Sequence, residues 1–377
     1  MKQFYPLSTF LTEYSEKNGV NAYRPVAVGR YGIRTRESIY SKELAKDYSK
    51  NKLIHKNTLT VGMGSVQIDI GVLTDDITYS VSPAYHTYKI AGVNAEYLRY
   101  CLECRNQDMF SRFVKRGSRQ GKTIDLKRWM TYEIPVYDEN RQQEIVDRLN
   151  RISELIEKRQ EQLVQLSELV KSRFIELFGT VKDNPYHFPT ATLKEVCHKI
   201  TDGKHGGCEQ ETDSGYYYVG AREIYDGVIH YDTAPQITFA DFAKDYRRCN
   251  IEQGDMVIVN TGATIGKSAI ASSHLTERTL LQKSVALIKV KTDVISAKFL
   301  RYCYMANPSM YMVESASAQP NLLLSKMNAT VIYLPPMELQ EQFAAFVEQT
   351  DKSKLAVQKG LQELEILKKS LMQQYFG

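Results

Sequence analysis

The chain has 377 residues, of which 43% are hydrophobic and 25% charged, and its formal net charge is +5. This composition is ordinary for a soluble protein, and the length allows two domains. No run reaches the roughly 18–20 apolar residues that cross a bilayer, and the N-terminus does not begin a signal peptide, so we expect a cytoplasmic protein. Six cysteines without framework spacing predict no metal site, because Cys101 and Cys104 lack the second pair that zinc needs.

The first predicted domain covers residues 1–133 and is a mixed α/β unit. Two short β-rich segments, Leu59–Val61 and Ile68–Val72, precede a helix expected around Tyr97–Arg112. A polar loop and a strand that runs into a proline follow this helix.

Residues 134–180 predict a long spacer helix. Its apolar residues recur with alternating spacings of three and four, which is typical of a coiled-coil seam that runs on to Leu177. About 38 helical residues correspond to a rod of roughly 55–60 Å. The residues predicted to pack along it are Ile145, Leu149, Ile152, Ile156, Leu163, Leu166 and Val170.

The second predicted domain, residues 181–333, repeats the framework of the first. It has β-rich segments at Val257–Asn260 and Ser284–Val290, and its Phe299–Cys303 corresponds to Tyr97–Cys101. The frameworks agree while the loops differ, which is expected of two domains that read different targets.

The final segment, residues 334–377, repeats the spacer helix. An offset of 198 residues places Phe178 on Phe376, and both copies end in Phe-Gly. An ordinary helical bundle would not explain this duplication, whereas one object that holds two readers would. The packing residues predicted on the second helix are Phe343, Val347, Leu361, Leu364 and Leu371.

Basic residues gather in glycine- and tyrosine-containing stretches of both predicted domains. Arginine binds both guanine edges and phosphates, so such loops suit contact with DNA, although a solvated surface is the alternative. The candidates in the first domain are Arg30, Arg34, Arg36, Arg116, Arg119 and Lys122. The candidates in the second domain are Lys204, His205, Arg222, Arg247, Arg248 and Lys267.

One segment is similar to a phosphate-binding P-loop. In Thr261–Ser268, only three residues separate Gly262 from Gly266, whereas the P-loop pattern needs four. We therefore expect a tight turn near bound DNA, with Lys267 on a phosphate, rather than a nucleotide site.

No catalytic set is predicted. Asp183–Tyr186 is similar to the Asn-Pro-Pro-Tyr box of amino-methyltransferases, but it lacks the second proline and no glycine-rich cofactor-binding turn accompanies it. The chain is therefore predicted to be a binding protein rather than an enzyme.

Taken in their order along the chain, the motifs resemble the specificity subunits of type I restriction–modification systems. The first half carries Ile134–Val136 and Arg141–Glu144, whereas its Val61–Ser65 only approximates the family's Gly-Ala-Thr-Ile-Gly turn. The motifs of the second half are Gly254–Val259, Gly262–Lys267, Ala318–Asn321 and Leu334–Pro336.

The resemblance implies an α+β fold in which two target recognition domains are separated by two long helices, packed as an antiparallel coiled coil with pseudo-two-fold symmetry. Each domain would read one half of a bipartite, asymmetric sequence in double-stranded DNA. Two modification subunits, which carry S-adenosylmethionine-dependent adenine methylation, would dock on this chain. Two restriction subunits would add ATP- and Mg²⁺-dependent translocation and cleavage, so the chain itself would hold no cofactor and no metal.

Three alternatives stay open. The chain could serve a related bifunctional restriction–methylation enzyme, it could be a P-loop-type nucleotide-binding protein, or it could be a structural coiled-coil adaptor. The identity of the partner chain, nucleotide binding and DNA binding, respectively, would separate them.

Overall fold

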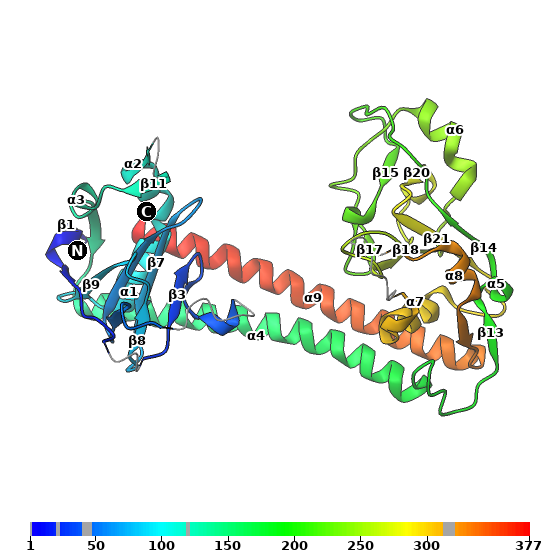
Figure 1. The fold of residues 1–377 in the computed structure, drawn as a ribbon, viewed down its shortest axis with the longest axis horizontal. Helices are drawn as coiled ribbons and strands as arrows, with labels where there is room; N and C mark the ends of the chain where they lie inside the picture. The colour runs from blue at the N-terminus through cyan, green and yellow to red at the C-terminus, as the bar shows by residue number, and fades with distance from the viewer. Residues whose placement is uncertain (1, 20–22, 40–46, 118–120, 312–320) are drawn as a thin grey trace. The chain divides into compact units, whose positions relative to one another are not determined.

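The computed structural model describes residues 2–19, 23–39, 47–117, 121–311 and 321–377. They form two compact units, the first from Met1–Gln160 with Gln358–Gly377 and the second from Glu161–Val357. Two 40-residue helices, α4 (Glu139–Phe178) and α9 (Met337–Phe376), contribute to both units (Figure 1).

The first unit is built on a four-stranded antiparallel sheet with the strand order β2-β9-β6-β7. The sheet strands are β2 (Leu11–Tyr14), β6 (Thr58–Met63), β7 (Ile68–Leu73) and β9 (His86–Ile90). Strand pairs surround it: β1 (Gln3–Pro6) with β12 (Glu133–Val136), β3 (Val26–Gly29) with β4 (Gly32–Thr35), β5 (Lys52–Ile54) with β8 (Tyr79–Val81), and β10 (Val114–Gly117) with β11 (Gly121–Ile124). The helical elements are η1 (Leu7–Thr9), η2 (Arg36–Ser38), α1 (Ala95–Cys104), α2 (Asn106–Phe113) and α3 (Leu126–Trp129).

The single helix expected around Tyr97–Arg112 is wrong, because α1 and α2 are separate helices that meet at Arg105. Arg105 has φ −94° and ψ 4°, outside the helical range. The buried side chain of Asn106 turns onto β7, where it accepts from the N–H of Ile68 (3.0 Å) and donates to its carbonyl (2.8 Å). Because both groups of the buried Asn106 amide find hydrogen-bond partners on β7, these bonds stabilise the break between α1 and α2.

The second unit repeats the same sheet, with the order β14-β21-β18-β19. Its strands are β14 (Cys197–Asp202), β18 (Met256–Val259), β19 (Ser268–Ile270) and β21 (Val285–Val290). The outer strands are β13 (Thr190–Thr192) with β22 (Val331–Tyr333), β15 (Tyr217–Val219) with β20 (Thr279–Leu281), and β16 (Ile224–Tyr225) with β17 (Val228–Ile229). The helical elements are α5 (Leu193–Val196), η3 (Ala221–Glu223), α6 (Phe239–Cys249), η4 (Thr276–Arg278), α7 (Ala297–Ala306), η5 (Pro308–Met310) and α8 (Leu324–Ala329).

The internal repeat extends to strand pairing. β6 pairs antiparallel with β7 and β9, and β18 pairs antiparallel with β19 and β21. The mixed α/β framework predicted twice from the sequence is therefore confirmed.

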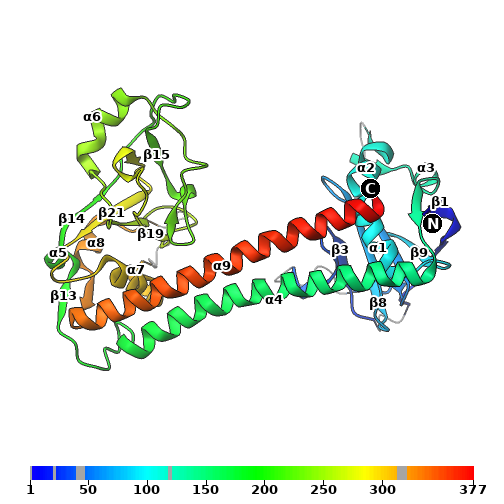
Figure 2. The same ribbon diagram turned by 180° about the vertical axis from the view of Figure 1, so that it is seen from behind.

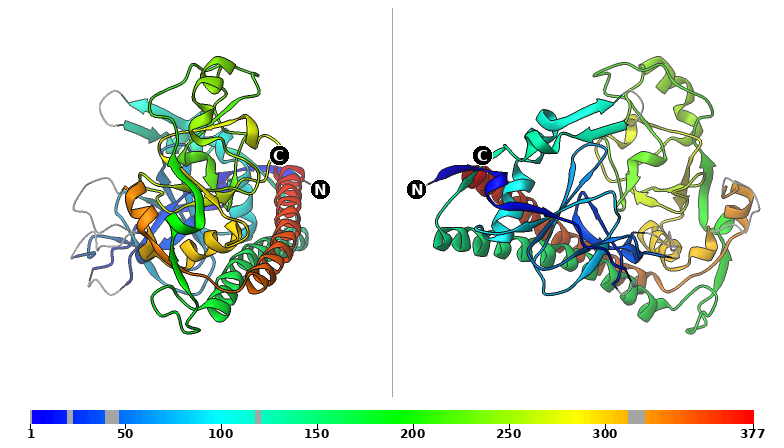
Figure 3. Two further views of the ribbon diagram at one scale, coloured as in Figure 1. Left: turned by 90° about the vertical axis from the view of Figure 1, so that its right-hand side faces the viewer. Right: turned by 60° about the vertical axis from the view of Figure 1, so that its left-hand side comes forward.

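The two long helices pack side by side and antiparallel within each unit (Figure 2 and Figure 3). In the first unit the start of α4 meets the end of α9, where Arg148 Nη1 donates to Tyr375 Oη at 3.0 Å. In the second unit the end of α4 meets the start of α9, where the rings of Phe174 and Phe343 lie 5.3 Å apart. The predicted antiparallel pair is confirmed.

Every residue predicted to pack along the two helices is buried or half-buried. The end of the seam differs from the prediction, because Leu177 is only half-buried while Phe174 and Phe178 are fully buried. Val170, Phe174 and Phe178 are spaced by four, not by three and four. The helix end packs into the domain core around Phe299 of α7 rather than continuing a two-helix seam.

Candidate nucleic-acid interface

The tip of the β3–β4 hairpin combines two arginines with an exposed tyrosine. Tyr31 is 69% exposed, and the guanidinium carbons of Arg34 and Arg30 lie 4.4 and 5.7 Å from its ring centroid. Such cation–π contacts orient both cations without neutralising them. Neither arginine makes an ion pair with a described residue, so both charges remain available to a phosphate. Arg36 lies in η2 after the hairpin, where it is half-buried against Tyr48 at 5.2 Å.

The β10–β11 hairpin is a second basic projection of the first unit. Arg116 in β10 stands opposite Lys122 in β11, and Lys115 Nζ lies 2.7 Å from Asp125 Oδ2. Lys122 Nζ donates to the carbonyl of Ser65 and so ties this hairpin to the β6–β7 turn. The remaining candidate of this hairpin, Arg119, lies outside the described residues.

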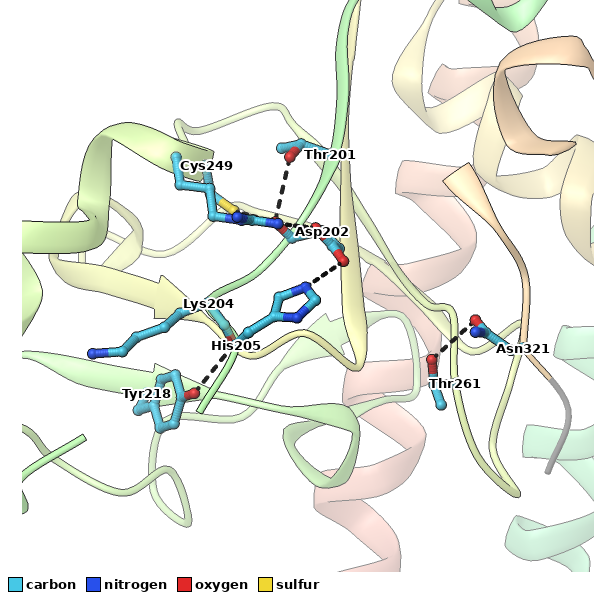
Figure 4. A network of polar contacts seen from close by, with 9 residues as sticks. Thr201, Asp202, Lys204, His205, Tyr218, Cys249, Thr261 and Asn321 are labelled. Carbon is cyan, nitrogen blue, oxygen red and sulfur yellow. Dashed lines mark hydrogen bonds and ion pairs between the residues drawn. The ribbon is translucent and has the colours of Figure 1, made fainter. Parts of the chain in front are cut away.

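In the second unit, Asp202 at the end of β14 binds two of the candidate side chains (Figure 4). Its Oδ2 lies 3.0 Å from His205 Nε2, and its Oδ1 accepts from Arg248, which also donates to the Asp202 carbonyl at 3.1 Å. Burial would raise the pKa of Asp202, but the hydrogen bonds from Arg248 and His205 outweigh it and lower the pKa. The ionised carboxylate thus fixes both side chains, while His205 stays 59% exposed.

Lys204 has a different environment from its neighbour. Its ammonium lies 2.9 Å from Asp245 and 3.5 Å from Asp241, and only 12% of the side chain is exposed. The hydrogen bond to Asp245 raises the pKa of Lys204. The charge is therefore neutralised inside the protein, and Lys204 anchors its loop against α6. Tyr218 Oη supports the same loop by donating to the Gly206 carbonyl at 2.6 Å. It also lies 3.5 Å from the Lys204 carbonyl (Figure 4).

The two remaining candidate arginines of the second unit, Arg222 and Arg247, are exposed. Arg247 precedes Arg248 in α6, and Arg222 lies in η3. Within the described part of the chain, neither side chain makes an ion pair. Both arginines therefore carry a charge that no described residue neutralises, in contrast to Lys204.

The P-loop-like segment is the turn of a β-hairpin, as expected. It joins antiparallel strands β18 and β19, and Gly262 and Gly266 have φ of 101° and 89°. A P-loop would lead into a helix instead. Lys267 is exposed, and Thr261 Oγ1 donates to Asn321 Oδ1 at 3.2 Å, which places Asn321 against the turn (Figure 4).

The cysteine pair is part of the core. Cys101 and Cys104 lie in α1, and burial raises the pKa of Cys101 to about 12 and also that of Cys104. Among the residues that the structure describes, no cluster of His, Cys, Asp and Glu could hold a metal ion. No helix in the same residues is long and apolar enough to cross a membrane.

Two residues that shape the candidate interface, Tyr31 and Asp202, were not predicted from the sequence. Tyr31 lies between the arginines in the sequence, and this pattern could have identified it. Asp202 carries no such signal, because an acidic residue does not stand out in a search for cations.

Two copies of one mixed α/β framework, each with exposed basic side chains, define a two-domain protein suited to binding DNA. The model of the type I restriction modification DNA specificity domain matches residues 11–166 and 186–366, and the chain belongs to this family.

Two solved structures share the fold. The S subunit of the type I restriction–modification system of M. genitalium has a TM-score of 0.57 and 15% identity over 100% of this chain and 96% of that one. A chain from a study of complex assembly and conformational transition in a type I system has a TM-score of 0.60 and 16% identity over 99% and 97%. The family model and both solved structures concern type I systems. They give no support to a nucleotide-binding protein or an adaptor.

Proposed function

We propose that the chain is the non-catalytic subunit that gives a type I restriction–modification complex its DNA sequence specificity. Residues 1–133 and 181–333 would be the target recognition domains, and residues 134–180 and 334–377 the spacer helices. Each domain would read one half of a bipartite, asymmetric target, and the helices would set the unread gap. Because its target is DNA, we expect it to act in the cytoplasm.

The main support is the segment between the first and second sheet strands of each unit. In the first unit, residues 15–57 contain the β3–β4 hairpin, whereas in the second, residues 203–255 contain β15, β16, β17 and α6. Eight of the twelve candidate residues lie in these two segments. A common framework that carries two unlike basic segments is what two different half-sites require.

The long helices also bear apolar side chains that no described residue covers. Exposed side chains on α4 and α9 include Leu155 (47%), Val164 (58%), Leu169 (50%), Leu355 (68%) and Ile366 (69%). Such surface supports docking of the two modification subunits, and the internal repeat would offer them equivalent sites. S-adenosylmethionine would reside on those subunits, and ATP and Mg²⁺ on two restriction subunits.

The test combines the purified chain with its cognate modification subunit. We expect adenine methylation at one bipartite sequence, which neither protein produces alone. Replacing residues 1–133 with the first domain of another family member should change one half-site only, as mapped by long-read sequencing. Methyl transfer by the isolated chain, or a change in both halves, would contradict the proposal. The same reconstitution shows whether the partner is a separate modification subunit or a bifunctional enzyme.

A further inference from the structure

The first unit has a basic, aromatic cavity that the candidate interface does not include. Its volume is about 520 Å³, and its lining includes Arg105, Arg112, Arg128, Phe113 and Tyr132. The cavity is accessible, since the Arg112 side chain is 61% exposed and Arg128 is exposed.

Aromatic rings hold the three guanidinium groups in place. The guanidinium carbons of Arg105 and Arg112 lie 5.7 and 5.9 Å from the ring centroid of Tyr132, and that of Arg128 lies 5.8 Å from Phe113. The two rings meet edge to face at 5.7 Å. Planar arginines fixed in this way lose little freedom when they bind an anion.

The cavity retains positive charge after its internal contacts are counted. Asp108 binds Arg112 Nε at 2.8 Å, and Glu133 lines the cavity, so two carboxylates face three arginines. Arg105 donates to the Phe376 carbonyl and to Tyr132, both uncharged. Arg128 makes no ion pair with any described residue. The cavity therefore suits an anion.

The internal repeat shows that the fold does not require this cluster. In the second unit, Lys326 and Thr330 stand where the first has Arg128 and Tyr132, at the offset of 198. The counterpart of Arg105, aligned through the α1 and α7 helices, is Asn307, whose side chain accepts from a backbone N–H at 2.9 Å. The same framework thus folds without the arginine cluster, which indicates a role specific to the first domain.

The cavity lies at the base of the basic β10–β11 hairpin. Arg112 and Phe113 end α2 directly before β10, and Arg128 lies in α3, which follows β11. Asp125 connects the two, because it caps α3 through the Arg128 N–H and binds Lys115 of the hairpin. An extended polyanion could follow the hairpin into the cavity, whereas a small free anion would use the cavity alone.

We propose that this cavity binds a backbone phosphate of the DNA beside the half-site read by the first domain. The inference rests on the proposed function. It adds a contact between the arginines of the cavity and a DNA phosphate, which would position the DNA without reading a base. Phosphate contacts contribute affinity that depends on salt but not on sequence.

The test measures DNA binding by the complex of the full chain with its modification subunit over a range of salt concentrations. Arg128→Gln should reduce the slope of log K against log salt by about 0.9, equally for target and unrelated duplexes. Arg128→Lys should largely restore the slope. Lys127→Gln is the matched control, because it removes the same charge from an exposed neighbour in α3 that does not line the cavity.

A slope for Arg128→Gln equal to that of the Lys127→Gln control would overturn the proposal. Arg128→Gln could instead fail to assemble with the modification subunit while the chain itself still binds DNA. This result would also overturn the proposal, since the cavity would then be a protein-docking site. Inorganic phosphate that binds the cavity without any change in the DNA slope would identify a free-anion site instead. Absence of sequence-specific methylation by the wild-type complex would refute the proposed function alone, because the slope can still be measured on unrelated DNA.

Discussion

The side chain of Gln340, in the first turn of α9, accepts a hydrogen bond from the backbone N–H of Ser296 at 2.9 Å. Gln142 of α4 makes the same 2.9 Å bond to the N–H of Asn94, and both amides also donate to a backbone carbonyl just before their own helix. Ser296 and Asn94 are the N-caps of α7 and α1. In both repeats, one buried glutamine thus joins the start of the long helix to the helix of its domain.

Removing this connection should destabilise the second unit. Gln340 is fully buried, so Gln340→Ala leaves the Ser296 N–H without a partner at a cost of about 1–3 kcal/mol. Gln342→Ala, on the exposed side of the same turn, should change stability by less than about 0.5 kcal/mol. Urea unfolding followed by circular dichroism would measure both. Equal stability of the two variants would show that the bond is dispensable.

Asp202→Asn should impair one half-site only. The substitution removes the charge that holds Arg248 and His205, and charge-assisted hydrogen bonds contribute about 1.5–3 kcal/mol each. We expect a loss of roughly tenfold or more in affinity for targets with an intact second half-site, at about 1.4 kcal/mol per tenfold. Glu211→Gln, an exposed change in the same unit, is the control. An equal loss on both half-sites would argue against a local role.

The same carboxylate predicts a dependence of stability on pH. Because the pKa of Asp202 is lowered in the folded state, its contribution is present above the ordinary carboxyl range and is lost as pH falls through the folded pKa. The stability difference between wild type and Asp202→Asn should therefore be constant near neutral pH and shrink in acid. A difference that grows on acidification would refute this assignment.

The β3–β4 hairpin should act on the first half-site. Arg34→Ala removes an unpaired cation 4.4 Å from the Tyr31 ring centroid, and Tyr31→Ala removes the ring that orients it. Both variants should weaken DNA binding by about 1–3 kcal/mol if the arginine contacts a base, and relax the first half-site in methylation maps. The second half-site serves as the internal control, and its sequence should not change.

The spacer prediction follows from helix geometry. A heptad inserted near Arg159, with a matching heptad near Val357, preserves the seam in both helices and lengthens each by about 10 Å. This corresponds to about three base pairs, so the variant should prefer a longer unread gap. Inserting two residues rotates the seam by about 200° and should disrupt packing. Methylation of substrates that differ only in gap length would decide, and an unchanged preference in the folded heptad variant would show that the helices do not set the gap.

The sequence by itself determined the features that repeat or have a local period. The spacing of Ile145, Leu149 and Ile152 predicts a buried helical stripe, and the offset of 198 reveals the duplicated framework, because both patterns can be read without distant contacts. The three residues between Gly262 and Gly266, where a P-loop needs four, likewise distinguished a turn from a P-loop.

Only the tertiary structure decided which cations are free to bind. Lys204 and His205 are adjacent, yet Lys204 is neutralised by Asp245 while His205 remains exposed beside Asp202. The cavity of Arg105, Arg112 and Arg128 likewise combines the junction between α1 and α2 with side chains from α2 and α3. The physical reason is that a charge is neutralised by its neighbours in space. Those neighbours can lie 41 residues away in the sequence, as Asp245 does from Lys204, and no local sequence pattern shows such a pairing.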